Sequence, residues 1–257
     1  MIPTHQSPQY VWLGVFSHPD DETSASGGTM PQLIKDGHIV QVVTATRGEL
    51  GTLGTGDIRI SRDQLPYVRE AELRKNMELI GAPPPIMLGY KDQNLNKEDP
   101  EIVSTELFNI MSDINTDIVV SFGPSGISGH TDHIATHQCT VESFTRYKKT
   151  QTEKSPLLLY PTIPPDIAHQ YNLTLSAEEK AIDIAISIKS TLHLKIKSLL
   201  NYESQEDAQE FAHRLKQTPD PFEYFTVSSH STSDWAKLDV ISYLLSIGES
   251  HRVFLPE

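Results

Sequence analysis

The segment from His18 to Glu22 reads HPDDE and places four ionisable side chains within five residues, directly after an apolar run that ends at Phe16. Neighbouring carboxylates repel one another unless a cation neutralises them. Pro19 stiffens the turn, so that His18 and Asp21, three residues apart, can converge on one point. A solvated acidic turn is the alternative interpretation, but the combination of residue types favours a metal site.

A second polar cluster reads HTDH and runs from His130 to His133, after a glycine-rich stretch that follows the predicted strand Asp117–Phe122. Glycine lets the backbone pass close to a ligand. Two histidines three residues apart at the start of a helix can face the same cleft. His137 follows one turn later, so a His133/His137 pair competes as a ligand set.

Two imidazoles and one carboxylate, from His18, Asp21 and a histidine of the second cluster, form a mixed nitrogen and oxygen set with an open fourth position, which is typical of catalytic zinc. Iron and manganese accept similar ligands, so we expect Zn²⁺ with another divalent transition metal as the alternative. Bound zinc lowers the pKa of water from about 15.7 to about 7. Asp20 is then free to act as the general base, which predicts a hydrolase.

The elements that must position these clusters follow from short apolar runs that alternate with longer helical patterns. This alternation is typical of a mostly parallel sheet with helices on both faces. In such sheets, ligands bind at the carboxyl ends of the strands, where both clusters lie. Strands are predicted at Tyr10–Phe16, Ile39–Thr44, Ile86–Leu88, Asp117–Phe122 and Leu157–Tyr160, and helices at Thr29–Asp36, Leu65–Ile80, Pro100–Asp113 and Thr131–Lys148.

The alternation stops after Pro164-Pro165. We expect a helix from about Ala177, one long amphipathic helix over Ser190–Leu215 and a further helix at Ser233–Ser246. Because this part of the chain carries few strand signals, these additional C-terminal helices are predicted to pack on the first half. The prediction is therefore a single domain over residues 1–257.

Composition narrows the classes of partner. The 257 residues carry 34 acidic and 21 Lys or Arg side chains, a net charge of -13, which argues against a nucleic-acid partner because phosphate binding needs clustered cations. The single cysteine, Cys139, suits a reducing compartment. The amino terminus lacks a basic region followed by an apolar run, and no apolar stretch approaches the roughly 18 residues that span a bilayer. We expect a cytoplasmic protein without membrane insertion.

The sequence resembles the PIG-L/LmbE family of zinc-dependent N-acetylglucosaminyl deacetylases. The resemblance rests on three motifs in the expected order, and weaker matches extend it over nearly the whole chain. These motifs are HPDDE from His18, TRGELGT from Thr46 and HTDH from His130.

This resemblance implies a Rossmann-like three-layer α/β fold whose metal is held by His18, Asp21 and His133. It also implies that Asp20 is the base, and that His130 stabilises the tetrahedral oxyanion or protonates the leaving amine. The substrate would be a small-molecule N-acetylated sugar or glycoconjugate, and the protein could assemble as a homo-oligomer, as relatives often do.

The resemblance further implies that Arg47 contacts the substrate, where its planar fork can bind sugar hydroxyls or an anionic group. An ion pair with Glu49 is the alternative role for Arg47. The sequence departs from the family pattern at two positions. Thr131 replaces a common proline, which should leave the ligands in place, and Ser128 stands where several members carry a tyrosine assigned to the oxyanion.

The predicted reaction is removal of an N-acetyl group from an N-acetylglucosamine-containing small molecule or glycoconjugate, with release of acetate and a free amine. The alternatives are an amidase or deacetylase for a thiol conjugate or non-sugar metabolite, and a catalytically weak sugar-binding homologue because of Ser128. A metal-dependent phosphohydrolase is disfavoured by the acidic chain and the lack of a second dense His/Asp set. A dinucleotide-binding module is disfavoured because the glycines from Gly48 to Gly56 lack GxGxxG spacing and follow the second strand.

Overall fold

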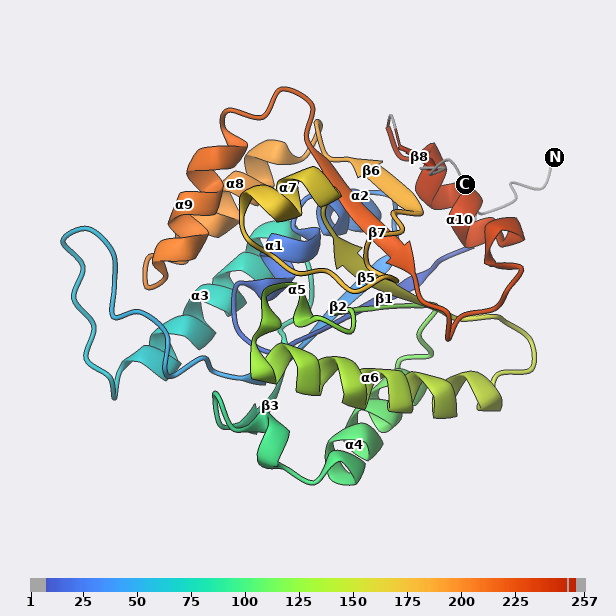
Figure 1. The fold of residues 1–257 in the computed structure, drawn as a ribbon, viewed down its shortest axis with the longest axis horizontal. Helices are drawn as coiled ribbons and strands as arrows, with labels where there is room; N and C mark the ends of the chain where they lie inside the picture. Colours follow the sequence, from blue (N-terminus) through green and yellow to red (C-terminus); the bar gives the residue numbers. More distant parts are fainter. Residues whose placement is uncertain (1–7, 249, 253–257) are drawn as a thin grey trace, which may run out of the picture.

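Five strands predicted from the sequence form the parallel part of one eight-stranded sheet (Figure 1). The computed structural model describes residues 8–248 and 250–252, and within them the strand order is β3-β2-β1-β4-β5-β7-β6-β8. The parallel strands are β1 (Val11–Phe16), β2 (Ile39–Thr46), β3 (Ile86–Tyr90), β4 (Ile118–Ser121) and β5 (Leu157–Thr162). Each begins and ends within two residues of its predicted bounds, so these predictions are confirmed.

The strand β1 lies at the centre of this parallel part. It pairs in parallel with β2 and β4, with Val11 opposite Ile39 and Trp12 opposite Ile118. All six residues of β1 are buried, as expected for a strand covered on both faces. Successive side chains point to opposite faces, so Trp12 packs into one core and Leu13 into the other.

Helices cover both faces of the sheet, which confirms the Rossmann-like three-layer α/β fold (Figure 1). The core on one face contains side chains from α4 (Pro100–Asp113) and α6 (Thr131–Thr150). The core on the other face contains side chains from α2 (Thr29–Lys35), α3 (Leu65–Ile80), α8 (Leu192–Asn201), α9 (Glu206–Leu215) and α10 (Asp239–Ser246).

Local signals set the ends of the predicted helices. The carboxylate of Asp99 accepts the backbone N–H of Glu101 at 2.9 Å, and Pro100 occupies the first turn of α4, where its missing N–H costs nothing. Gly81 ends α3 with a φ of 80°, a left-handed conformation that glycine adopts without steric penalty. Short helices complete the first half: α1 (Asp21–Ser26), the 3₁₀ helix η1 (Leu95–Lys97) and α5 (Gly126–Gly129).

The prediction of few strands after Pro164-Pro165 is wrong. Three strands, β6 (Ile184–Ser187), β7 (Phe222–Val227) and β8 (His251–Arg252), extend the sheet through antiparallel pairing with β5 and with one another. The run of β6 is only four residues long, and a short apolar run cannot be distinguished from a buried helical segment by its periodicity. Because the sheet draws strands from both halves of the chain, this topology supports the single domain that we predict for residues 1–257.

The helix predictions for the second half need correction. The helix expected from about Ala177 is a turn, and α7 (Pro165–Gln170) lies earlier. The long helix expected over Ser190–Leu215 is two helices, α8 and α9, broken at Tyr202–Gln205. The segment Ser233–Ser246 contains the 3₁₀ helix η2 (Trp235–Lys237) followed by α10.

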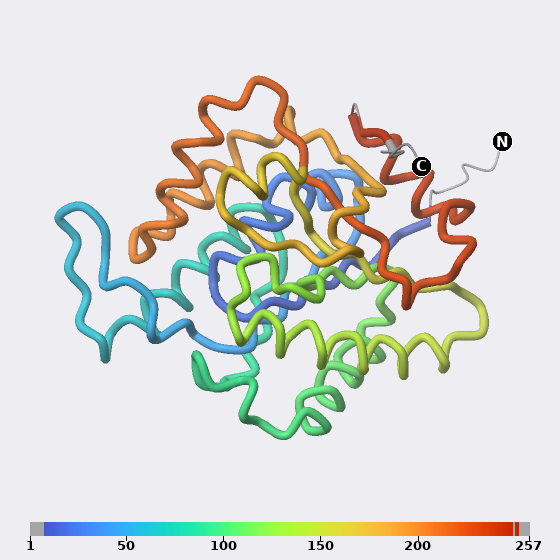
Figure 2. Tube along the Cα trace, in the orientation of Figure 1, coloured from blue at the N-terminus to red at the C-terminus, as the bar shows by residue number. Residues whose placement is uncertain are grey.

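The chain trace in Figure 2 shows a long loop between β2 and α3 that extends to one side of the molecule, near α9. Hydrogen bonds tie this loop to the break between α8 and α9: the hydroxyl of Thr52 donates to the carbonyl of Ser204 at 2.7 Å, and that of Thr55 to the carbonyl of Glu203 at 2.8 Å. Among the described helices, none is both long and apolar enough to cross a membrane.

Candidate active site

The two predicted polar clusters meet at the carboxyl ends of β1 and β4. His18 follows β1 within two residues, and His133 lies in the first turn of α6, which follows β4 and α5. The strands β1 and β4 are neighbours in the sheet. The chain places β2 and β3 on one side of β1 and then β4 and β5 on the other side, so the strand order reverses between β1 and β4. Such a switch in strand order opens a crevice at the carboxyl edge of an α/β sheet, where ligands bind.

His18, Asp21 and His133 converge on one point. The Nε2 atom of His133 lies 3.2 Å from the Nδ1 atom of His18, and the Asp21 carboxylate lies 3.5 Å from His18 Nδ1 through Oδ2 and 3.4 Å from His133 Nε2 through Oδ1. Ligand atoms at 2.0–2.1 Å from a tetrahedral zinc lie about 3.3–3.4 Å from one another. The spacing and the chemistry of these donor atoms therefore fit one zinc ion.

The other nitrogen of each of these histidines has a partner that orients the ring. His133 Nδ1 lies 3.0 Å from the carbonyl oxygen of Gly126. His18 Nε2 lies 3.1 Å from an Asp92 oxygen and 3.4 Å from an Asp132 oxygen. A metal-binding imidazole usually donates its second N–H to a carbonyl or carboxylate in this way, which fixes the tautomer and raises the basicity of the ligand atom.

Asp92 and Asp132 contact the cluster, although sequence reasoning did not assign them to the metal site. Asp132 is fully buried, and its carboxylate also accepts the backbone N–H groups of Gln93 at 2.6 Å and Leu95 at 3.1 Å. Together with His18, these two carboxylates form a second group whose ligand atoms lie within 4.8 Å of one another. This group uses the opposite face of the His18 ring, so it can orient His18 while Nδ1 binds a cation.

The electrostatics of the cluster favour positive charge. Burial by itself lowers the pKa of His18, but the carboxylates of Asp132, Asp21 and Asp92 outweigh it and raise that pKa well above its usual range. Burial opposes ionisation of Asp92, yet the bond to His18 lowers its pKa to about 2. In the same way His133 and His18 hold the pKa of Asp21 below its usual range against the effect of burial. The cluster is thus suited to a bound cation.

Asp20 lies beside the ligand cluster in a strained conformation. Its φ is 102°, in the left-handed region that L-residues rarely adopt, and its side chain is buried. The Nη2 atom of Arg69 donates to Asp20 Oδ2 at 2.7 Å. Burial raises the pKa of Asp20 well above its usual range; the charge of Arg69 opposes this shift, and that of Asp21 adds to it.

Arg69 is a third residue whose place beside the cluster sequence reasoning did not identify. It is 4% exposed, and besides Asp20 it donates to the carbonyl oxygens of Pro19 at 2.5 Å and Gly48 at 2.9 Å. The planar guanidinium can make these bonds at once because its donors lie in a fixed fork. Arg69 therefore holds the turn that carries Asp20 against the loop after β2.

His130 caps α6 and faces the same cluster. Its Nδ1 atom accepts the backbone N–H of Asp132 at 3.2 Å, and its ring centroid lies 4.7 Å from that of His18. A nitrogen of His130 also lies within 4.8 Å of nitrogens of His18 and His133, which makes three histidines a geometrically allowed ligand set. However, an Nδ1 atom that accepts a hydrogen bond leaves the proton of the neutral ring on Nε2. That assignment favours His130 as a hydrogen-bond donor over a metal ligand.

His137 does not join the cluster. Its Nδ1 atom lies 2.9 Å from the carbonyl oxygen of Phe122, and its ring packs edge-on against Tyr160 at a centroid distance of 5.3 Å. The structure therefore gives no support to the competing His133/His137 pair.

Arg47 pairs with a residue of α3, whereas Ser128 contacts the ligand cluster. Arg47 Nε donates to Glu70 on α3 at 2.5 Å, whereas Glu49, the alternative partner, accepts the backbone N–H of Asp92. The Ser128 hydroxyl lies 3.4 Å from Nδ1 of His133, the nitrogen that faces away from His18. Ser128 thus contacts the back of a ligand ring, and it also belongs to the lining of the cleft beside the cluster.

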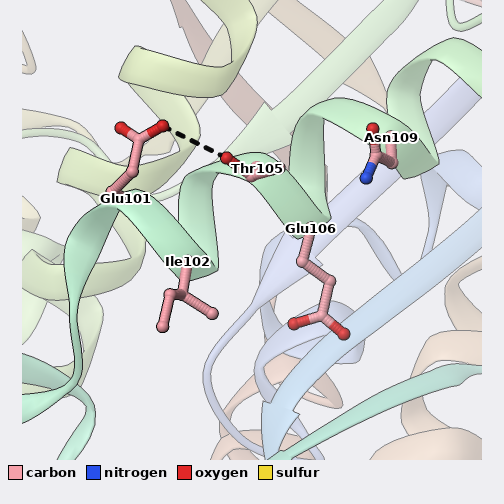
Figure 3. A pocket seen from close by; sticks show the side chains of 5 residues that line it. All are labelled: Glu101, Ile102, Thr105, Glu106 and Asn109. Carbon is pink, nitrogen blue, oxygen red and sulfur yellow. Dashed lines mark hydrogen bonds between the residues drawn. The ribbon is translucent and has the colours of Figure 1, made fainter.

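A cleft of ≈ 670 Å³ opens beside the cluster and includes Asp20, Asp21 and His133 in its lining. A second hollow is formed by α4 alone and is lined by Glu101, Ile102, Thr105, Glu106 and Asn109 (Figure 3). The hydroxyl of Thr105 there donates to Glu101 at 3.3 Å. No predicted site residue lines the α4 hollow, so the first cleft is the candidate substrate site.

The comparison with protein families assigns the chain to one class. The family described as PIG-L, GlcNAc-PI de-N-acetylase, matches residues 13–144, about half of the chain, and this region contains all six predicted site residues. The chain belongs to the PIG-L family.

Two curated relatives illustrate the similarity. A protein of Bacillus cereus named probable N-acetyl-alpha-D-glucosaminyl L-malate deacetylase 2 is 32% identical over 140 residues, 54% of this chain and 63% of the relative. A protein of Kineococcus radiotolerans named 1D-myo-inositol 2-acetamido-2-deoxy-alpha-D-glucopyranoside deacetylase is 31% identical over 157 residues, 51% of this chain and 44% of the relative. The match thus spans less than two thirds of either relative.

Solved structures share the fold over a larger part of the chain. The N,N'-diacetylchitobiose deacetylase from Pyrococcus horikoshii superposes with a TM-score of 0.66 at 21% identity, covering 86% of this chain and 84% of that one. GalB, a 4-carboxy-2-hydroxymuconate hydratase from Pseudomonas putida, superposes with a TM-score of 0.65 at 16% identity, covering 85% and 96%. Since a hydratase and a deacetylase share this architecture, the structural likeness shows the fold, and the chemistry must be argued from the site.

Proposed function

We propose that the protein is a metal-dependent N-deacetylase that removes the acetyl group from an N-acetylglucosamine-containing small molecule or glycoconjugate. The observation that carries this proposal is the spacing of the donor atoms of His18, Asp21 and His133, which suits one tetrahedral ion, beside the carboxylate of Asp20. The names of the two curated relatives, both of them deacetylases of glucosamine conjugates, support the choice of reaction.

In this proposal His18 Nδ1, His133 Nε2 and the Asp21 carboxylate hold Zn²⁺, with another divalent transition metal as the alternative. The bound ion would polarise the amide carbonyl and lower the pKa of water. Asp92 and Asp132 hold the second nitrogen of His18, so that Nδ1 keeps its lone pair toward the site.

Asp20 takes the proton from the attacking water. Arg69 binds Oδ2 of this carboxylate, so the proton goes to Oδ1. Burial raises the pKa of Asp20, and a base whose pKa is closer to the operating pH transfers protons more efficiently. The water oxygen first bonds to the carbonyl carbon. The C–N bond then breaks, and the amine leaves with a proton as acetate forms.

His130 stabilises the oxygen that becomes negative and serves as a proton donor to the leaving amine. Its Nδ1 atom is occupied by the N–H of Asp132, which leaves the Nε2–H free for this purpose. Arg47 contacts the substrate in this proposal; its side chain is 41% exposed although Glu70 binds it. The Ser128 hydroxyl lies 3.4 Å from His133 Nδ1 and donates to the carbonyl oxygen of Gly126, so in this proposal His130 acts without help from that hydroxyl.

Two further expectations belong to the proposal. Cys139 is a free, buried cysteine, which is in keeping with the reducing cytoplasm that we propose for the protein. Assembly as a homo-oligomer stays a prediction.

The test is acetate release from a set of N-acetylated sugars by the zinc-loaded protein, with the Asp20→Asn variant beside it. We expect turnover by the parent protein and a loss of at least about 10²-fold in the variant, the lower range for general-base catalysis. The matched control is Asp113→Asn, which makes the same change at an exposed position near the end of α4 and should keep full activity. The proposal fails if no acetyl sugar is hydrolysed, and the role of Asp20 fails if Asp20→Asn keeps full turnover with metal bound.

A further inference from the structure

The cleft beside the catalytic cluster continues well beyond it, between α9, the segment after β5 and the start of β7. We propose that this extension binds an uncharged, apolar aglycone of the substrate, an alkyl or aromatic group attached to the sugar. The inference rests on the proposed N-deacetylase function and names the class of substrate. The apolar side chains that line the extension include Ile163, Ile167, Leu173, Phe211, Leu215 and Phe222.

The size of the cleft leaves room for more than the sugar. Its ≈ 670 Å³ lies within the range of about 300–1,000 Å³ that is typical of pockets for drug-sized ligands. A single N-acetylhexosamine is much smaller than such a ligand. With the acetamide group against Asp20, Asp21 and His133, the remaining length of the cleft must receive what the sugar carries.

The walls of the extension argue against a polyol. Sugar and inositol hydroxyl groups need hydrogen-bond partners when they are buried. Polar side chains such as Asp207 and Asp220 also line the cleft, but most of its lining is apolar, and isoleucine, leucine and phenylalanine side chains offer hydroxyl groups no partner. These apolar side chains instead gain free energy when apolar surface is removed from water. This distinguishes the proposed ligand from the inositol conjugate named for the Kineococcus radiotolerans relative.

The charges of the lining argue against an anionic aglycone. Apart from Asp20 and Asp21, which belong to the catalytic cluster, the cleft is lined by three carboxylates, Asp207, Asp220 and Glu223, and by two cations, Lys195 and Arg214.

Both cations already have partners. Lys195 Nζ lies 2.6 Å from Glu223, and both of these side chains are only 3% exposed. Arg214 lies 3.5 Å from Glu210 and stacks on the rings of Tyr171 and Phe211 at 5.1 and 5.6 Å. A malate group, as named for the Bacillus cereus relative, would meet an excess of negative charge here.

Phe211 is a wall residue whose ring contacts both cations of the cleft. Lys195 Nζ lies 5.3 Å from its ring centroid on one side, and Arg214 contacts the ring as well. Through its second contact, with Tyr171, Arg214 links the residue after α7 to α9 across the cleft. All of these residues come after residue 144, where the family match ends. The proposed preference for an apolar aglycone therefore depends on the second half of this chain.

The experiment compares kcat/KM for N-acetylglucosamine glycosides that carry methyl, butyl, hexyl, phenyl or malyl groups, using the metal-loaded protein. We expect kcat/KM to rise up to about fourfold per added methylene that becomes buried, and the malyl conjugate to fall below the butyl glycoside. In the Phe211→Ala variant, the ratio of kcat/KM for the hexyl glycoside to kcat/KM for the methyl glycoside should fall toward one. The Phe211→Leu variant should retain most of the parent ratio. Ile102→Ala, at an exposed site on α4, is the matched control and should keep the parent ratio.

The proposal is overturned if kcat/KM in the parent protein is the same for all of these aglycones. It is also overturned if lengthening the acyl group from acetyl to hexanoyl, on a methyl glycoside, gives the gain and Phe211→Ala removes it, because the cleft then holds the acyl chain. If no glycoside is hydrolysed, the proposed function fails. Calorimetric binding of hexyl and methyl glucosaminides then tests separately whether the cleft binds the aglycone. Tighter binding of the hexyl compound, lost in Phe211→Ala, supports the aglycone site, and equal binding overturns it.

Discussion

At the scale of residues, the two nitrogens of His18 face different groups. Nδ1 lies near Asp21 and His133, whereas Nε2 lies near Asp92 and Asp132. An imidazole has one lone pair and one N–H when it is neutral, so partners on the Nε2 side direct the lone pair to Nδ1. The His18 ring therefore connects the turn after β1 with the loop after β3.

Replacing Asp92 tests this orientation. We expect Asp92→Asn to weaken metal binding by about 10–100-fold while the protein stays folded, because it removes a negative charge that lies 3.1 Å from His18 Nε2. Competition with a chromogenic chelator measures the metal affinity, and Asp113→Asn serves as the control at an exposed position. Parent-like affinity in Asp92→Asn would show that Asp132 alone orients the ring.

Arg69 gives a second prediction at this scale. In Arg69→Lys a single ammonium group cannot reproduce the bonds to Pro19, Asp20 and Gly48, so the Asp20 carboxylate should lose its alignment. We expect kcat to fall by about 10²-fold, the effect of a small misplacement of a catalytic group, with unchanged metal content. The control is Arg74→Lys on the same helix, where the arginine is 46% exposed. A parent-like kcat in Arg69→Lys would show that Arg69 does not position Asp20.

The candidate site could be predicted in part from the sequence. His18, Asp21, His130 and His133 occur in dense clusters at strand ends, and the structure brings these four together. Arg69 gave no such signal, because a lone arginine on a helix is usually exposed and only the tertiary structure reveals its burial.

At the scale of elements, the break between α8 and α9 shows why their boundary was missed. The segment Ser190–Leu215 contains neither glycine nor proline, so nothing local indicates a stop. The break depends on distant partners: the Ser204 backbone N–H donates to Glu72 on α3 at 2.9 Å, and the Tyr202 hydroxyl donates to Glu22 at 2.6 Å. Tertiary hydrogen bonds of this kind compensate for the lost helical ones.

The strand β7 was missed for a related reason. Its residue Glu223 is buried, which the sequence would not suggest for a carboxylate. The carboxylate accepts from the backbone N–H groups of Gly28 and Thr29 at 2.8 Å each and pairs with Lys195 at 2.6 Å. One side chain thus joins the start of α2, helix α8 and the antiparallel part of the sheet.

We expect Glu223→Gln to lower the free energy of unfolding by about 3–5 kcal/mol, because it leaves the buried ammonium group of Lys195 without a counter-charge. Urea denaturation followed by circular dichroism measures the change. The matched variant Asp234→Asn removes a carboxylate from the exposed pair with Lys237 and should change stability by less than about 0.5 kcal/mol. Similar small effects in both variants would mean that the buried pair adds little to the stability of this junction.

At the scale of the whole molecule, the sheet has two parts that differ in how well the sequence predicts them. The strands β1 to β5 are joined through helices, and the resulting alternation of apolar runs and helical patterns is readable in the chain. The strands β6 to β8 pair antiparallel across long connections, and each is short or interrupted by a polar residue. Only the packing of the second half on the first decides that these segments are strands.

Because the proposed ligands come from segments more than 100 residues apart, the metal should stabilise the whole fold. His18 and His133 meet only in the native state, so an ion that binds there favours folding through mass action, by about 2.7 kcal/mol at 100 times its Kd. For a chain of this size that corresponds to a rise in Tm of about 5–10 °C. Calorimetry with stoichiometric to excess zinc, and again after chelation, measures the shift. Asp21→Asn should lose most of it, whereas Asp113→Asn should keep it; an equal shift in both variants would place the stabilising ion elsewhere.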